Sequence, residues 1–240
     1  PFIFIAALGF FLIPFLIKYL PEINSHLEPG QKIALKLDGL KRVLSERKQV
    51  LALLFTGFVM FGHFLVVPFI NPFLEFNRGY SKSITPLIYL VGGTAAFFSA
   101  NILGRVSDRV GKLKVFRICV FISLPLVIVL THLVTIPYWI VLLLFACWFT
   151  VSTGRGVTSQ AMVSHVADPK YRGSFQNFNS SLQQAGTGLA SLVAGFVVVE
   201  KAGGRIGHYS RLGYLSVGVL VVALLLAQFL FSPRQQSVVK

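Results

Sequence analysis

The stretch GRVSDRVGKLKVFR, from Gly104 to Arg117, places five basic residues and one aspartate between two runs that are almost wholly apolar. The whole chain is 55% hydrophobic and only 12% charged, and its mean hydropathy is +0.74. Soluble domains carry roughly 25% charged residues, so the solvent around most of this chain is lipid. The charged stretch is therefore a break between two segments that cross a membrane.

Seven segments combine a length of about 18 residues or more with few charges, which is what an α-helix needs to cross a bilayer. They are residues 1–19, 50–73, 86–103, 115–133, 137–164, 175–199 and 212–231. Runs of this length exceed a β-strand, and they lack the alternation of polar and apolar positions that is typical of a membrane barrel. The sequence predicts an all-α integral membrane protein, with one helix followed by a six-helix transmembrane bundle.

The distribution of polar residues predicts four parts. Residues 1–20 are expected to be the end of a transmembrane helix from a preceding half, and 21–49 a cytoplasmic linker. Residues 50–232 are expected to form the bundle, and 233–240 a cytoplasmic tail.

The net charge of +14 comes from clusters of Lys and Arg in alternate connections. Basic residues fill the linker, the 104–117 stretch, the connection after the fifth span and the tail, whereas THLVTIP, after the fourth span, has none. By the positive-inside rule the basic connections and the C-terminus are cytoplasmic, and we expect a bacterial inner membrane protein. Lys201, Arg205 and Arg211 depart from this pattern. The charge is explained by topology, so no nucleic-acid partner is expected.

Two passages carry a resemblance to a known family. GRVSDRVGK fits the pattern G-x-x-x-D-[RK]-x-G-[RK], and the passage STGRGVTSQAMVSHVADPKYRGSFQNFNSSLQQAGTGLAS follows further along the chain. Both resemble the major facilitator superfamily, over residues 50–232, and in particular its bacterial drug:proton antiporter-like and sugar-efflux-like members. The resemblance implies twelve helices in two halves, of which this chain contains the C-terminal one. The N-terminal half, absent from this chain, would be its partner.

The resemblance also implies a role for the first passage. Its pattern residues, here called the latch motif, are Gly104, Asp108, Arg109, Gly111 and Lys112. In the family the aspartate pairs with the nearby arginine and with a helix end of the other half, which closes the cytoplasmic side. We expect both glycines to make turns at the ends of a short loop. The alternative is a basic loop that only sets topology.

Polar residues recur at helical spacing within three spans, and we take them as candidates for a substrate cavity. In the second, fifth and sixth spans they are Thr56, His63, Asn71, Trp148, Ser152, Arg155, Gln176, Ser180, Gln183, Thr187 and Ser191. The alternatives stay open. The polar residues of the sixth span, and His63, could instead bond neighbouring helices, and Arg155 could extend to the membrane interface.

The sequence contains no constellation for catalysis or metal binding, and no cofactor is expected. The resemblance implies a secondary active transporter, within the lipid bilayer, that exports small amphipathic molecules or sugars. Uptake of a solute is the alternative, and a membrane scaffold or membrane-embedded enzyme is the alternative of another class. Proton coupling is left open: Glu75, Asp108, Asp168 and Glu200 lie at span ends or in loops, so His63 or the other half would carry the proton.

Overall fold

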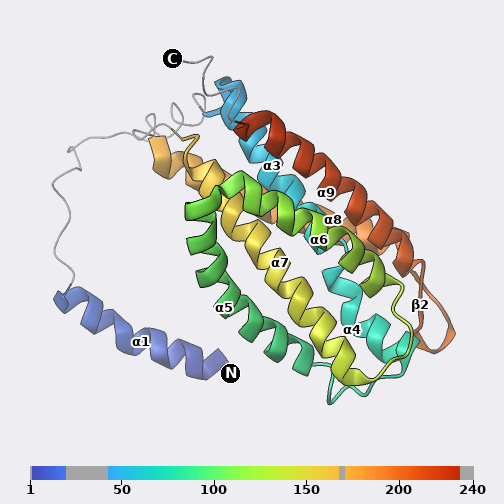
Figure 1. The fold of residues 1–240 in the computed structure, drawn as a ribbon. Coiled ribbons are helices and arrows are strands. Elements are labelled where there is room, and N and C mark those ends of the chain that lie inside the picture. Colours follow the sequence, from blue (N-terminus) through green and yellow to red (C-terminus); the bar gives the residue numbers. More distant parts are fainter. Residues whose placement is uncertain (1, 20–42, 168–170, 233–240) are drawn as a thin grey trace. The chain divides into compact units, whose positions relative to one another are not determined.

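The computed structural model describes residues 2–19, 43–167 and 171–232, and these are almost entirely helical (Figure 1). They belong to two compact units, Pro1–Asp38 and Gly39–Lys240. In the first unit α1 (Phe2–Tyr19) is apolar on all sides, and none of its residues is buried. Its length of about 27 Å is close to the thickness of a hydrocarbon core. The expected linker 21–49 lies largely outside the described residues, and the tail 233–240 lies wholly outside them.

The second unit contains the expected six-helix bundle. Its long helices are α3 (Arg47–Phe64), α5 (Leu87–Val110), α6 (Lys112–Thr131), α7 (Tyr138–Ser164), α8 (Arg172–Val197) and α9 (Tyr209–Phe231). Six described helices are long and apolar enough to cross a membrane, and these include α1 and the continuous segment Arg47–Asn77. The helix α8, predicted as the span 175–199, is long enough at 26 residues but less apolar, because polar side chains follow one of its faces.

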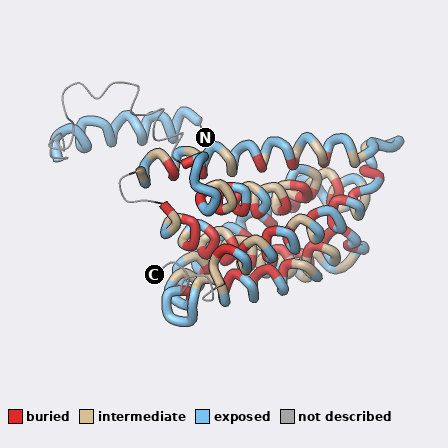
Figure 2. The backbone as a smooth tube through the Cα atoms, turned by 90° about the horizontal axis from the view of Figure 1, so that it is seen from above, coloured by how far each residue is buried: buried red, intermediate tan, exposed pale blue. Residues whose placement is uncertain are grey.

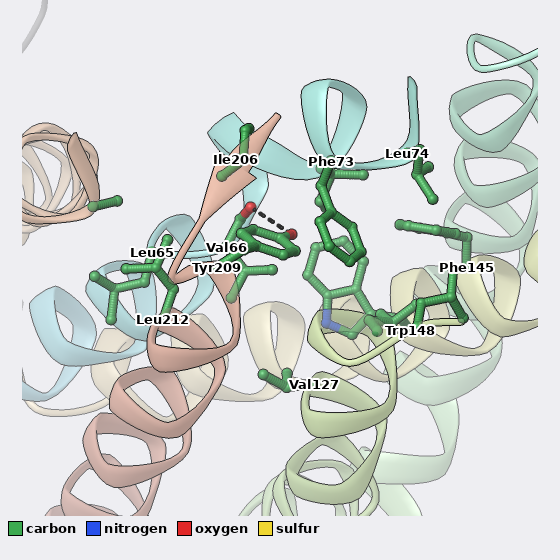
Figure 3. Close-up of a cluster of buried hydrophobic side chains, with 14 of the residues drawn as sticks. Leu65, Val66, Phe73, Leu74, Val127, Phe145, Trp148, Ile206, Tyr209 and Leu212 are labelled. Atoms are coloured by element: carbon green, nitrogen blue, oxygen red, sulfur yellow. Dashed lines mark hydrogen bonds between the residues drawn. The ribbon is translucent and has the colours of Figure 1, made fainter. Parts of the chain in front are cut away.

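The segment after α3 is an irregular continuation of the same span. It comprises η1 (Val67–Phe69), α4 (Ile70–Pro72) and the π-helical η2 (Phe73–Asn77). Pro68 and Pro72 cause the irregularity, since proline has no N–H to donate to the helical ladder. Beside the break, the carbonyl of Val66 accepts from the N–H of Phe69 and also from the hydroxyl of Tyr209, at 3.2 Å (Figure 3).

A short antiparallel ribbon connects α8 and α9, which the sequence did not predict. It consists of β1 (Val199–Glu200) and β2 (Ile206–Gly207), joined through η4 (Ala202–Gly204). The side-chain amide of Asn77 extends the ribbon, because it donates to the carbonyl of Ile206 and accepts from its N–H, both at 2.8 Å. The broken end of the α3 span is thereby tied to the β1–β2 ribbon.

The helices pack so that one side of the bundle stays uncovered within this unit. Helix α3 packs against α8 and α9, α6 packs against α7 and α9, and α5 lies mainly along α7. Helices α3 and α7 also contact each other. Figure 2 shows that buried positions follow the sides on which helices meet. Few residues of α5 and α8 are buried, so both helices keep long exposed sides. The helices α5, α7, α3 and α8 therefore frame the open side of the bundle.

Two helix pairs approach closely because a glycine lies at the contact. A Cβ built on Gly186 of α8 would lie 2.7 Å from the carbonyl oxygen of Gly57 in α3. A Cβ on Gly213 of α9 would lie 2.1 Å from Oγ1 and 3.0 Å from Cβ of Thr131 in α6. Rotation of the threonine cannot relieve the second clash, since its Cβ is itself too near. Both contacts depend on the missing side chain.

We predict that Gly213→Ala destabilises the bundle, because an added methyl group at a filled contact costs about 1–3 kcal/mol. Gly218 is the matched control on the same helix, since nothing lies within 4 Å of its built Cβ. Gly218→Ala should leave stability unchanged or raise it by up to about 1 kcal/mol through helix propensity. Thermal unfolding of the two purified variants in detergent measures the difference. Equal midpoints would show that α6 and α9 can separate at no cost.

Candidate functional site

The charged stretch that separates the two spans is not a loop. Helix α5 continues to Val110, past the predicted end at 103, and α6 begins at Lys112. A single residue, Gly111, connects them with φ of 101°, a conformation that side chains disfavour. The expected turn at Gly104 is therefore wrong: Gly104 lies inside α5, where its built Cβ would meet Val157 of α7 at 3.9 Å. The motif's second glycine makes the turn, and its first lies beside α7.

The latch motif also differs from expectation in its ion pair. Oδ1 of Asp108 lies 3.9 Å from Nζ of Lys112, across the turn, and the aspartate side chain is 71% exposed. The same lysine donates to Nε2 of His165 at 2.8 Å. The expected pair with Arg109 is wrong, because consecutive helical residues project in directions about 100° apart. Asp108 therefore keeps most of its carboxylate surface available.

Charged and polar groups gather around this turn in a cavity of about 660 Å³. Its lining includes Asp108, Lys112, Lys114, Arg117 and His165. Asp108 comes from the end of α5, the basic residues from the start of α6, and His165 directly follows α7. The cavity is strongly basic, with a single carboxylate among its lining residues.

A second polar group, here called the amide cluster, connects α3, α7 and α8. Oε1 of Gln160 accepts from Nδ2 of Asn179 at 3.0 Å and from Nε2 of Gln183 at 3.2 Å. Its Nε2 donates to Oε1 of Gln176 at 3.0 Å, and the hydroxyl of Thr56 donates to Oδ1 of Asn179 at 2.7 Å. Three predicted cavity residues thus meet through two that were missed. Asn179, three residues after Gln176 and four before Gln183, lies on the same helix face, so the spacing alone could have found it.

The remaining polar residues of the sixth predicted span bond their own helix or face outward. The hydroxyl of Thr187 donates to the carbonyl of Gln183, and that of Ser191 to the carbonyl of Thr187, both at 3.0 Å. Ser180 is exposed. Asn71 lies in α4, outside both the amide cluster and the cavity at the Gly111 turn. Its buried Oδ1 has no partner among the described residues. The structure therefore divides the predicted cavity residues rather than gathering them in one place.

The other predicted residues meet at a cavity of about 260 Å³ between α3 and α7, here called the Arg155 cavity. Its lining consists of Val59, Met60, His63, Phe64, Phe149, Ser152, Thr153, Arg155 and Gly156. Trp148, in the core cluster of Figure 3, stacks on the imidazole of His63 with ring centroids 4.9 Å apart. Met60, Phe149 and Ser152 are partly exposed, so the cavity communicates with the outside of the bundle.

Arg155 lies well inside its helix. Helix α7 continues to Ser164, nine residues further, which is about 13 Å along the axis. The side chain is only 2% exposed, so it does not extend to an interface. Its Nη2 donates to Oγ of Ser152 at 3.1 Å, whereas Nε and Nη1 have no partner among the described residues. An intramembrane cation with unused donors indicates a functional site.

A family model described as the Major Facilitator Superfamily matches residues 1–191 of this chain. The chain belongs to this superfamily. The match includes the latch motif, the Arg155 cavity and most of α8, and it confirms the family inferred from the sequence. It also includes α1 and ends within α8, so its range differs from the expected 50–232. Members of the superfamily are secondary transporters, and this chain is accordingly an integral membrane protein of a transporter family.

The described residues offer no group of three His, Cys, Asp or Glu side chains that could bind a metal ion. Cys119 is buried and Cys147 exposed, and both are free thiols. The residues that line the Arg155 cavity offer hydrogen-bonding groups, positive charge and aromatic surface.

We predict that Asp108→Asn in the full-length transporter slows turnover and shifts the resting population toward a state open on the side of this turn. The substitution nearly preserves shape but removes the charge that, by the family resemblance, would meet a helix N-terminus of the other half, and such an interaction stabilises by about 0.3–2 kcal/mol. Labelling of single cysteines beside the turn should become faster. Lys114→Gln is the control, since it alters the same basic surface and leaves the carboxylate. Parental turnover and labelling in Asp108→Asn would reduce the motif to a topology signal.

Proposed function

We propose that this chain forms one half of a secondary active transporter that exports small amphipathic molecules by alternating access. The observation that carries the proposal is the Arg155 cavity. Met60, Phe64 and Phe149 give it an apolar wall, and His63, Ser152 and Arg155 give it hydrogen-bonding groups. Pockets that combine apolar surface with a few polar anchors bind small amphipathic ligands.

The second half of the transporter would cover the open side of the bundle. Helices α5 and α8, at the margins of that side, expose polar side chains within the length that crosses the membrane. They include Thr94, Asn101, Asn177, Ser180 and Gln184. Exposure of so many polar groups to lipid is unfavourable, whereas a second bundle or a water-filled path would accept them. The Arg155 cavity would then lie near the boundary of two halves, where alternating access requires a binding site.

Export is preferred to uptake because the passage 152–191 is similar to the drug:proton antiporter-like and sugar-efflux-like members. Sugars are a second candidate substrate class, since the amides of Gln160, Gln176 and Gln183 could bond hydroxyl groups. If transport is coupled to protons, His63 is the candidate carrier in this half. No Asp or Glu lies in the middle of a described span, since Glu46, Glu75, Asp108 and Glu200 are all near helix ends or in connections.

The direction of transport gives the first test. We propose a bacterial inner membrane location with the turn at Gly111 and the C-terminus in the cytoplasm. Inverted membrane vesicles that contain the full-length protein should then accumulate labelled amphipathic compounds when energised, and right-side-out vesicles should not. Accumulation in right-side-out vesicles alone would establish uptake in place of export.

The cavity itself is tested by filling it. We predict that Ser152→Leu lowers substrate affinity about tenfold, the equivalent of 1.4 kcal/mol, because the larger side chain occupies the space beside Arg155. Cys147→Leu is the matched control, since Cys147 is exposed and lies on the opposite side of α7. Concentration-dependent uptake into the vesicles of the preceding experiment gives the affinity. Equal affinities in the two variants would exclude the cavity from the transport path.

A further inference from the structure

The Arg155 guanidinium is held inside the bundle without a counter-charge from the described residues. The side chain is 2% exposed, and the one hydrogen bond of its guanidinium is the 3.1 Å bond from Nη2 to Ser152. The ion pair found among the described residues joins Lys112 and Asp108, far along the helices from this site. A buried cation without a partner is costly, and such groups in membranes normally meet an opposite charge.

The unused donors converge on one cavity. Nε and Nη1 of Arg155 and Nδ1 of His63 are buried and have no hydrogen-bond partner among the described residues. Both side chains line the Arg155 cavity, which has a volume of about 260 Å³. Phe64 and Phe149 supply ring surface at the same cavity. Charge and donors thus lie beside apolar surface.

We propose that the Arg155 cavity binds an organic anion, with a carboxylate toward Arg155 and an aromatic or apolar body against Phe64 and Phe149. This names the substrate class of the transporter proposed above and rests on that proposal. The planar fork of a guanidinium matches the two oxygens of a carboxylate, and hydrogen bonds between charged partners are about twice as strong as neutral ones. A neutral amphipath would leave the cation unpaired, and an organic cation would be repelled.

The competing explanation is an acidic side chain from another part of the full-length protein that pairs with Arg155. In that arrangement the cavity has no net charge to offer, and anionic and neutral ligands of equal shape bind alike. Charge discrimination between two such ligands therefore separates the explanations. The measurement concerns binding alone, so it is independent of the direction of transport.

The experiment uses the full-length protein in detergent with 2-naphthoate and its neutral counterpart 2-naphthamide, and measures both dissociation constants by calorimetry. We expect 2-naphthoate to bind at least about tenfold more tightly, as a charged hydrogen-bonded pair implies. This comparison needs no variant, so it holds even if substitutions disturb folding. Equal affinities, or no measurable binding of 2-naphthoate, would overturn the proposal.

Variants assign the preference to Arg155. Arg155→Gln should weaken 2-naphthoate binding at least about tenfold and change 2-naphthamide binding by less than about threefold. Arg155→Lys keeps the charge without the fork and should retain part of the preference. Arg78→Gln is the matched control, because Arg78 lies on the ring of Phe73 at the end of the α3 span and not in this cavity. An unchanged preference in Arg155→Gln would overturn the assignment.

Discussion

Hydrocarbon offers no hydrogen bonds, and this constraint governs every level of the structure. It requires that each crossing segment satisfy its own backbone, which is why the long elements are helices. Where prolines interrupt the α3 span, Tyr209 bonds the carbonyl of Val66, and Asn77, at the end of the broken segment, bonds the backbone of Ile206. The same requirement explains the amide cluster, whose side chains bond one another across α3, α7 and α8. Among the described residues, Arg155 alone has two buried donors without a hydrogen-bond partner.

Composition and the length of the apolar segments predicted the architecture, because a helix that crosses a bilayer needs about 20 mostly apolar residues. The six helices of the bundle and α1 were all expected, and the pattern around Asp108 identified the family before any coordinates. The predicted ends of the helices were less accurate where a helix continues into charged residues. Hydropathy ends a span at the first basic residue, but the backbone of α5 continues through Arg105 and Arg109 to Val110. Arginine is a good helix former, so its charge does not end the helix.

The candidate site was only partly predictable, because it depends on which helices meet. Spacing along one helix placed Trp148, Ser152 and Arg155 on one face, and the structure puts His63 of α3 opposite them. Spacing could not show that Gln160 of α7 forms hydrogen bonds with three residues of α8 at once. Nor could it show the ribbon between α8 and α9, whose short strands depend on Asn77 from a distant segment.

The one-residue connection at Gly111 has a mechanical consequence. Successive Cα atoms are 3.8 Å apart, so the adjoining ends of α5 and α6 cannot separate, and neither helix can slide along its axis without pulling the other. Both also pack against α7, which supplies Arg155. An occupant of the cavity that displaces α7 would therefore also displace α5 and α6, and with them the basic surface beside Asp108. The backbone conformation of Gly111, with φ of 101°, sets the angle between the two helices.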